Sequence, residues 1–302
     1  MNKELLIYLD GKFVEKGKAV VSVFDHGLLY GDGVFEGIRA YGGSVFRLID
    51  HIDRLYDSAK SIHLKIPLTK YELTEAVLET LRKNHLRDGY IRLVVTRGSG
   101  DLGVDPSLCK TPTIFIIAEP ATTSLGQKDP KVVNLMMAST RRDTADGTSH
   151  EIKSLNYLNS ILAKIEANSA GADDAIFLDH RGFVSEASVT NIFIVKDGRV
   201  STPSSASGIL HGITRQRVIR LCSDLGMDVL ERDVTPFELI TADEVFLVGT
   251  KAEIISVGNI SGTKIGSGGP GPLTRRLCQE FAKVVHRPEE GTPIFEAESV
   301  SV

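Results

Sequence analysis

The chain has 302 residues, a formal net charge of -4 at pH 7, and 42% hydrophobic and 25% charged residues. This length is sufficient for two domains with their own cores, and the composition is that of a globular protein rather than a disordered or fibrous one. A slightly acidic chain offers no basic surface for nucleic acid, and no apolar run approaches the ~20 residues that cross a bilayer. The N-terminus has no apolar segment with a small-residue cleavage site, so we expect a cytoplasmic protein. Cys109, Cys222 and Cys278 are far apart in the sequence, which favours reduced packing residues over a disulfide or metal site.

The chain begins with a predicted hairpin, because apolar residues 5–9 and 12–14 flank the turn dipeptide Asp10-Gly11. Residues 22–41 follow, and they are rich in glycine and aromatic residues. Glycines let the backbone approach closely, and aromatics such as Tyr30 and Phe35 form apolar walls, which is how a small pocket is lined. Core packing explains these two aromatics equally well. A dinucleotide loop is excluded, because Glu36 occupies the position where that fingerprint requires glycine.

Apolar periodicity predicts a helix that begins near residue 48 and a second helix over residues 70–86. Arg54 lies just off the apolar face of the first helix. It either pairs with a carboxylate as a structural bridge, which the residues alone favour, or presents its planar fork to a phosphate. The buried faces are expected to consist of Leu48, Ile52, Leu55 and Ala59 in the first helix, and Leu73, Val77, Leu78 and Leu81 in the second.

A strand over residues 90–97 places Tyr90 and Arg92 on one face of a sheet. Residues 98–103 then match a glycine fingerprint, but they lead into a proline turn rather than a helix, so we reject a dinucleotide site. The polar residues 121–130 are the predicted linker between an N-terminal domain, residues 1–120, and a larger domain, residues 131–302. The tail from Pro288 onward is expected to be loosely ordered.

Lys153 immediately precedes a predicted helix in which Leu155, Leu158, Leu162 and Ile165 form a buried face and Ser154 caps the first turn. A lysine held at such a boundary, near buried surface, can lose its charge and attack a carbonyl carbon. For a lysine taken singly, a solvated surface position remains the commoner outcome.

Two further segments carry polar groups that could bind an anion or a cation. Glu186 stands at the start of an apolar strand, where a carboxylate needs a buried cation, either on a bound molecule or on a scaffold lysine or arginine. A helix that begins at Ile213 would gather free N–H groups at Ile213 and Thr214, which suits a phosphate. An ordinary glycine turn capped by Thr214 fits the same residues.

Lys153-Ser154-Leu155-Asn156-Tyr157-Leu158-Asn159 resembles the cofactor-lysine segment of the branched-chain aminotransferases, class IV, fold-type IV enzymes that use pyridoxal 5'-phosphate. The similarity extends from about residue 5 to about residue 285, with four motifs in the right order. It implies a two-domain α+β / α/β protein with the cofactor at the domain interface, completed by a neighbouring subunit in a homodimer or higher homo-oligomer. Three residues depart from the usual pattern: Val189 where glycine is usual, Thr190 where an acidic residue is frequent, and Lys251 where alanine is usual.

The resemblance also implies residue roles. Lys153 would form the aldimine with the cofactor and move a proton, Tyr157 would bind the ring oxygen, and Glu186 the pyridine nitrogen. The phosphate would be held by Arg54, Ile213, Thr214 and Thr250, with Leu210 and Gly212 in the same cofactor-binding set. The substrate-binding set would be Tyr30, Phe35, Tyr90, Arg92, Thr250, Lys251 and Ala252. We expect the Lys251 side chain to point outward.

The implied reaction transfers the amino group of leucine, isoleucine or valine to 2-oxoglutarate. A D-amino-acid aminotransferase or an aminodeoxychorismate lyase would share the lysine, the arginine and the glutamate. A protein that binds the cofactor without turnover is the alternative outside enzymes.

Overall fold

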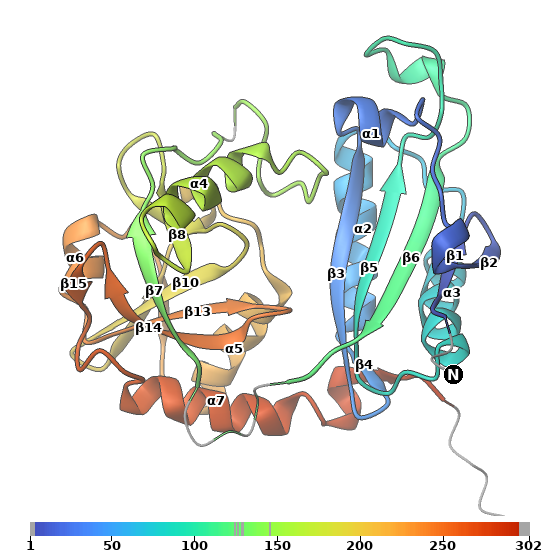
Figure 1. Ribbon diagram of the computed structural model, residues 1–302. Coiled ribbons are helices and arrows are strands. Elements are labelled where there is room, and N and C mark those ends of the chain that lie inside the picture. Colours follow the sequence, from blue (N-terminus) through green and yellow to red (C-terminus); the bar gives the residue numbers. More distant parts are fainter. Residues whose placement is uncertain (1–3, 124, 126, 128–129, 145, 296–302) are drawn as a thin grey trace, which may run out of the picture. The chain divides into compact units, whose positions relative to one another are not determined.

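The computed structural model describes residues 4–123, 125, 127, 130–144 and 146–295 (Figure 1). The chain forms two compact units. Unit 1 consists of Met1–Thr122, Ile152–Asn156 and Val285–Val302, and unit 2 of Thr123–Glu151 and Tyr157–Val284. The domain ranges expected from the sequence therefore differ in two places, since residues 152–156 and 285–295 group with the first unit. Local sequence patterns do not show that a segment pairs or packs with a sheet formed much earlier in the chain.

Unit 1 contains a seven-stranded sheet in the order β16-β4-β3-β5-β6-β1-β2, with antiparallel pairing throughout. Its strands are β1 (Leu6–Leu9), β2 (Lys12–Glu15), β3 (Gly33–Tyr41), β4 (Ser44–Phe46), β5 (Gly89–Thr96), β6 (Thr113–Pro120) and β16 (Gly291–Pro293). The predicted hairpin is confirmed: Asp10 and Gly11 both have positive φ, 46° and 84°, as a type I′ turn requires.

Two long helices cover this sheet, and both predicted buried faces are confirmed. The helices of unit 1 are α1 (His26–Tyr30), α2 (Leu48–Ser61) and α3 (Lys70–Lys83), with short 3-10 turns η1 (Lys16–Lys18), η2 (Pro106–Leu108) and η4 (Pro288–Glu290). The expected apolar residues of α2 and α3 join residues of β3 and β5 in one core. A capping box between Thr69 and Glu72 fixes the start of α3.

The prediction of a loose tail is wrong for residues 288–295. Strand β16 pairs with β4, and Ile294 is fully buried in the core of unit 1. The Arg47 amide also donates to the Glu290 carbonyl. Burial of Ile294 and completion of the sheet edge outweigh the weak local propensity of this segment. Residues 296–302 lie outside the described part of the chain.

Unit 2 contains a larger mixed sheet in the order β12-β11-β10-β13-β14-β7-β8-β9, with β15 paired to β14. Its strands are β7 (Val132–Met137), β8 (Asp174–Leu178), β9 (Val184–Ala187), β10 (Asn191–Lys196), β11 (Arg199–Thr202), β12 (Val229–Glu231), β13 (Glu244–Gly249), β14 (Glu253–Ile260) and β15 (Thr263–Lys264). The end strand β9 contacts β10, a strand far from it in the hydrogen-bonded order, so the sheet curls on itself. One apolar core fills the curl.

The helices of unit 2 are α4 (Leu158–Ser169), α5 (Ile213–Asp224), α6 (Pro236–Ile240) and α7 (Pro272–Val284), and η3 spans Ser205–Ser207. Helix α4 packs on β8, whereas α5 and α7 pack on each other and on β13 (Figure 1). Cys222 on α5 and Cys278 on α7 are buried free thiols, as expected of packing residues. Burial raises the pKa of Cys222 to about 11 and that of Cys278 to about 12.

The buried face predicted for the helix after Lys153 is wrong. Helix α4 begins at Leu158 with Tyr157 as its N-cap, and its buried residues are Ser160, Ala163 and Ala167. The two alanines pack against Phe177 of β8, because small side chains let the helix approach the sheet closely. The large apolar residues face outward, and Leu158, Ile161, Leu162 and Ile165 are 45% to 67% exposed. Apolar periodicity therefore predicted the presence of this helix correctly, but the face that it predicted to be buried is exposed.

In the described ranges, no helix is long and apolar enough to cross a membrane. The same residues contain no cluster of three or more histidine, cysteine or acidic side chains that could hold a metal ion.

Candidate functional site

Lys153 lies in an extended segment that adds to β3 of unit 1, rather than at the start of a helix. Its carbonyl accepts from the Phe35 amide at 3.0 Å, and its own amide donates to Ser58 Oγ at 3.2 Å. The Leu155 amide donates to the Gly33 carbonyl at 3.0 Å. A Cβ at Gly33 would lie 2.8 Å from Leu155 Cδ1, so a glycine is needed for this approach. The rigid support expected for Lys153 is therefore present, but strand pairing supplies it.

The Lys153 ammonium and the Arg92 guanidinium both contact the ring of Phe35. Lys153 Nζ is 4.6 Å and Arg92 Cζ 4.4 Å from the ring centroid. Phe35 is 6% exposed. An aromatic face attracts a cation, so the ring of Phe35 helps to hold the amine of Lys153 in place. Three of the predicted site residues are thus brought together.

Tyr90 reaches across the sheet to Gly37 of β3. A Cβ at Gly37 would overlap the Tyr90 hydroxyl oxygen. Gly37 is therefore a close neighbour of the candidate residue Tyr90 that sequence reasoning missed. The signal was a glycine within a long apolar strand, which marks a place of close approach by another group.

Arg54 is bound to a carboxylate, as in the structural-bridge alternative. Its Nε donates to Glu36 Oε1 at 2.7 Å and its NH2 group to Oε2 at 2.8 Å. His51 Nδ1 lies 2.7 Å from the same Oε2. His51 and Arg54 are three residues apart on α2, so both face Glu36 on β3.

Glu36 is a completely buried carboxylate, a role that its place in the sequence does not indicate. Burial alone would raise its pKa, but the charge of Arg54 and the hydrogen bonds from Arg54 and His51 lower it to about 2. Burial lowers the pKa of His51, so its imidazole is neutral near pH 7. The fork of Arg54 is therefore fixed in orientation by an anion that is ionised over the whole physiological range.

Tyr30 is bound to its own loop in this chain. Its hydroxyl accepts from the Gly103 amide at 3.0 Å, and its side chain is 38% exposed. His26, at the other end of α1, has Nε2 2.9 Å from the Asp101 carbonyl. These two contacts join α1 to the loop that follows β5.

In unit 2, Glu186 of β9 receives donors on both oxygens. Oε1 accepts from Arg142 NH2 at 2.9 Å, and Oε2 accepts from Asn191 Nδ2 at 2.8 Å and the Leu210 amide at 3.2 Å. Glu186 is 3% exposed. The scaffold cation that was the alternative partner is thus present as Arg142, which sequence reasoning missed because nothing distinguishes it from its neighbour Arg141.

The start of α5 lies beside this carboxylate. Asn191 Nδ2 also donates to the Leu210 carbonyl at 2.9 Å, and a Cβ at Gly212 would overlap Asn191 Oδ1. Gly212 is the N-cap of α5 and supplies no capping side chain, so the alternative in which Thr214 caps the helix is wrong. Since no side chain caps them, the first N–H groups of α5 suit an anion.

Thr250, Lys251 and Ala252 form the turn between β13 and β14, closed by the pairing of Gly249 with Glu253. The side chain of Lys251 is exposed, and its outward orientation from a pocket stays a prediction. A Cβ at Gly249 would lie 3.0 Å from Thr190 Cγ2, so the start of β10 adjoins this turn.

The structure also shows the surroundings of Val189 and Tyr157 in unit 2. Val189 is 68% exposed and is not among the residues with positive φ, so valine replaces the usual glycine without backbone strain. The ring of Tyr157 is half-buried, with its centroid 5.9 Å from that of His150.

Comparison with known proteins defines the class of protein. Residues 33–260 match the model of the family described as amino-transferase class IV. The chain belongs to this family and is an aminotransferase, and the two-domain fold-type IV architecture expected from the sequence is confirmed.

Individual relatives are more specific. The chain is 55% identical over 278 residues, 92% of its length and 96% of the relative's, to a Methanocaldococcus jannaschii protein provisionally named as a branched-chain-amino-acid aminotransferase. It is 38% identical to the Escherichia coli branched-chain-amino-acid aminotransferase, covering 91% of both chains. A crystal structure of the E. coli enzyme is similar with a TM-score of 0.92 and 35% identity, over 97% of this chain and 100% of that one. The pyridoxal phosphate form of the branched-chain amino acid aminotransferase from Thermobaculum terrenum gives a TM-score of 0.88 at 32% identity, over 98% and 100%.

Proposed function

We propose that the chain is a branched-chain amino acid aminotransferase that uses pyridoxal 5'-phosphate and transfers the amino group of leucine, isoleucine or valine to 2-oxoglutarate. The observation that carries the proposal is Lys153, whose backbone is pinned to β3 and whose ammonium rests on the ring of Phe35. The names of the similar proteins support the substrate class and the cofactor. A cytoplasmic location is part of the same proposal.

The donor set of the chain fits this cofactor, which has an aldehyde, a pyridine nitrogen and a phosphate. Lys153 offers an amine for the aldehyde and Glu186 a buried carboxylate for the pyridine nitrogen. Uncapped N–H groups at Ile213 and Thr214, together with Arg54 and Thr250, suit the phosphate. When bound, the cofactor accepts the electron pair released at the substrate Cα.

The remaining chemistry belongs to side chains of this protein. Lys153 Nζ would take the proton from the substrate Cα and deliver it to the cofactor carbon on the other side of the amino nitrogen, a 1,3 transfer that requires a neutral amine at the start. Glu186 holds the proton on the pyridine nitrogen. The Tyr157 hydroxyl hydrogen-bonds the ring oxygen.

The substrate is oriented by the predicted substrate-binding set. Phe35 and Tyr30 offer apolar surface to a branched side chain, and Tyr90 together with the Thr250 to Ala252 backbone binds the α-carboxylate. Arg92 is assigned to the distal carboxylate of glutamate, the second substrate. The Arg92 guanidinium contacts the ring of Phe35, as the Lys153 ammonium does. Glutamate and the branched-chain amino acid would therefore both bind beside that ring.

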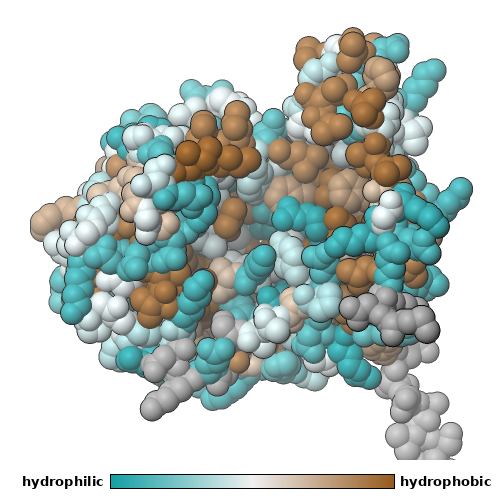
Figure 2. Space-filling view, viewed as in Figure 1, coloured by the Kyte–Doolittle hydropathy of each residue, from teal (hydrophilic) through white to brown (hydrophobic). Residues whose placement is uncertain are grey.

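We propose a homodimer or higher homo-oligomer. Supporting it, the segment before and within α1 and the loop after β5 expose apolar side chains on one region of unit 1 (Figure 2). This region includes Val20, Val23, Phe24, Leu28, Leu102 and Val104, each between 51% and 83% exposed. Such a patch on a folded chain is typical of an interface. Sedimentation equilibrium should give a multiple of 32.8 kDa, and a monomer at micromolar concentration would contradict the proposal.

The test of the function is a half-reaction panel. Purified holoprotein is mixed with single L- and D-amino acids, and the change in cofactor absorbance is followed. We expect rapid bleaching by L-leucine, L-isoleucine, L-valine and L-glutamate and at least about 100-fold slower bleaching by their D-enantiomers. Preference for D-alanine or D-glutamate would indicate a D-amino-acid aminotransferase, and no bleaching by any amino acid would indicate a binding protein without turnover.

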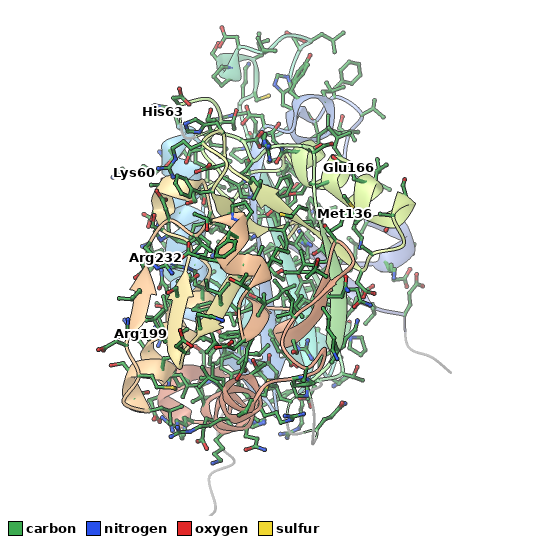
Figure 3. All side chains as sticks on the ribbon, turned by 90° about the vertical axis from the view of Figure 1, so that its left-hand side faces the viewer. Lys60, His63, Met136, Glu166, Arg199 and Arg232 are labelled. Carbon is green, nitrogen blue, oxygen red and sulfur yellow. The ribbon has the colours of Figure 1, made fainter. Side chains whose placement is uncertain are left out.

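We expect Arg54→Lys to weaken cofactor binding by roughly tenfold, because lysine keeps the charge beside Glu36 but cannot donate bidentately to a phosphate. The measurement is the dissociation constant of pyridoxal 5'-phosphate from the apoprotein. The matched control is Lys60→Ala, an exposed position on the same helix that is labelled in Figure 3. Unchanged affinity in Arg54→Lys would return Arg54 to a purely structural bridge with Glu36.

Lys251→Ala is expected to change the half-reaction rates with L-leucine and L-glutamate by less than about twofold. The side chain is exposed, and a surface charge contributes little to binding at a site that its own backbone serves. A selective loss with L-glutamate would show instead that Lys251 recognises the distal carboxylate.

A further inference from the structure

Arg142 is a buried arginine that no step of the proposed reaction uses. It is 2% exposed, and its guanidinium carbon lies 3.9 Å from the centroid of the Phe177 ring on β8. NH1 donates to Asn159 Oδ1 and Ser160 Oγ of α4, both at 3.2 Å. The position of the guanidinium is therefore set by a strand and a helix of the same unit.

The backbone that carries Arg142 is held separately. Its amide donates to the Leu178 carbonyl at 3.0 Å. The carboxylate of Glu166 on α4, labelled in Figure 3, accepts from the amides of Ser139 at 2.7 Å and Thr140 at 3.0 Å. Both hydroxyls of that pair also donate to it, and these hydrogen bonds lower the pKa of Glu166 to about 2. The segment from 139 to 142 is thus fixed at both ends.

NH2 of Arg142 donates to Glu186 Oε1 at 2.9 Å and to the Ala187 carbonyl at 3.1 Å. Because Asn191 and the Leu210 amide occupy the other oxygen, the carboxylate plane of Glu186 is fixed from two sides. A carboxylate this deeply buried without a cation takes up a proton near neutral pH and then donates rather than accepts.

Stability alone does not account for the pair. Arg142 Nε is buried and has no hydrogen-bond partner among the residues that the structure describes. Replacing such a buried pair with apolar residues is often neutral or stabilising. The arrangement instead enforces a charge state, which matters only if Glu186 must accept a hydrogen bond.

We propose that Arg142 is a positioning residue. It keeps Glu186 ionised and oriented to accept a hydrogen bond from the protonated pyridine nitrogen of the cofactor. This inference rests on the proposed function, in which Glu186 contacts that nitrogen. Arg142 acts through Glu186 and need not touch the cofactor.

Two charged or titratable side chains that face Glu186 within unit 2 are Arg142 and His150. His150 Nε2 is 3.5 Å from Oε1, and the Tyr157 ring lies beside His150. Since an ordinary imidazole titrates near neutral pH, each pH series below is repeated in a His150→Gln background.

The first measurement uses apoprotein and concerns only the charge of Glu186. In Arg142→Gln, the pKa of Glu186 should rise above its unfolded value, because the carboxylate stays buried and its cation is gone. A folded pKa above the unfolded one makes the folded state less stable as pH rises from about 4.3 through the new value. The thermal unfolding temperature of Arg142→Gln should therefore decrease as pH is raised from about 5 to about 8. The double variant Arg142→Gln/Glu186→Gln lacks this carboxyl group and should not show that decrease.

The second measurement is cofactor binding at pH 8, by titrating apoprotein with pyridoxal 5'-phosphate. We expect Arg142→Gln and Glu186→Gln each to weaken binding by about tenfold or more, with no further loss in the double variant, since both act on one contact. Arg142→Lys should recover part of the loss and also serves if Arg142→Gln does not fold.

Two results would overturn the inference, and they differ in what else they overturn. Normal cofactor affinity and no added pH dependence in Arg142→Gln, with weakened binding in Glu186→Gln, would reject the role of Arg142 alone. Normal affinity in Glu186→Gln would reject the assignment of Glu186 to the cofactor, and the role of Arg142 with it.

Discussion

Replacing Lys153 with alanine is expected to lower the rate of transamination by about 10⁴-fold or more, because one nitrogen both binds the cofactor and carries the proton. The structure gives this expectation its basis. The lysine is fixed through backbone bonds to Phe35 and a contact of its amide with Ser58, so the loss is of a preorganised group. The measurement is steady-state turnover of L-leucine with 2-oxoglutarate, and added methylamine should restore a small part of the rate.

The matched control is Lys164→Ala. Lys164 is on α4, and its ammonium donates to the Asp173 carbonyl in an exposed contact. Its removal should leave turnover within about twofold of the unmodified chain, as is usual for surface substitutions. Comparable losses in the two variants would show that the effect of Lys153→Ala is structural.

Glu36→Gln is expected to be the most destabilising of these single substitutions, by about 3 kcal/mol, because it leaves the Arg54 charge without its buried counter-ion. For a chain of this size, that corresponds to a fall in Tm of roughly 6–12 °C. Glu289→Gln is the control, since Glu289 is an exposed carboxylate of the same unit. Calorimetry of the apoproteins makes the comparison.

The pH dependence of this effect has a definite sign. The folded pKa of Glu36, about 2, lies below its ordinary value of 4.5. Its stabilising contribution is therefore present above pH 4.5 and is lost as pH falls toward 2. The stability difference between the unmodified chain and Glu36→Gln should be constant from about pH 7 to 5 and shrink on further acidification. A difference that grows on acidification would contradict the ion pair described here.

Local patterns predicted the elements of unit 1 well, because its helices bury one face against a sheet. The four apolar positions of α2, spaced by three and four residues, all enter the core. The same periodicity failed for α4, where alanines pack on Phe177 and the leucines face outward. Apolar spacing identifies an amphipathic helix but not the partner of its apolar face, which can belong to another molecule.

The predicted site residues were found from local chemistry and from a family resemblance, and their partners were not. Lys153, Arg54 and Glu186 could each be named from the sequence. Glu36 and Arg142 could not, because each becomes significant only through a contact with a residue 18 or 44 positions away in the chain. Sequence reasoning offered a structural partner and a cofactor partner as alternatives for Arg54 and for Glu186. The structure shows the structural partner in both cases, Glu36 for Arg54 and Arg142 for Glu186. In the proposed function, Arg54 and Glu186 each bind the cofactor as well.

The central claim is that Lys153 carries the cofactor, and reduction of the holoprotein with borohydride tests it most directly. The reduced protein is digested and the peptides are mapped by mass spectrometry. We predict a single pyridoxyl label on Lys153, in the peptide that contains Ser154 to Asn159. A label on Lys164 or Lys251, or no retained label in a protein that has bound the cofactor, would contradict the account.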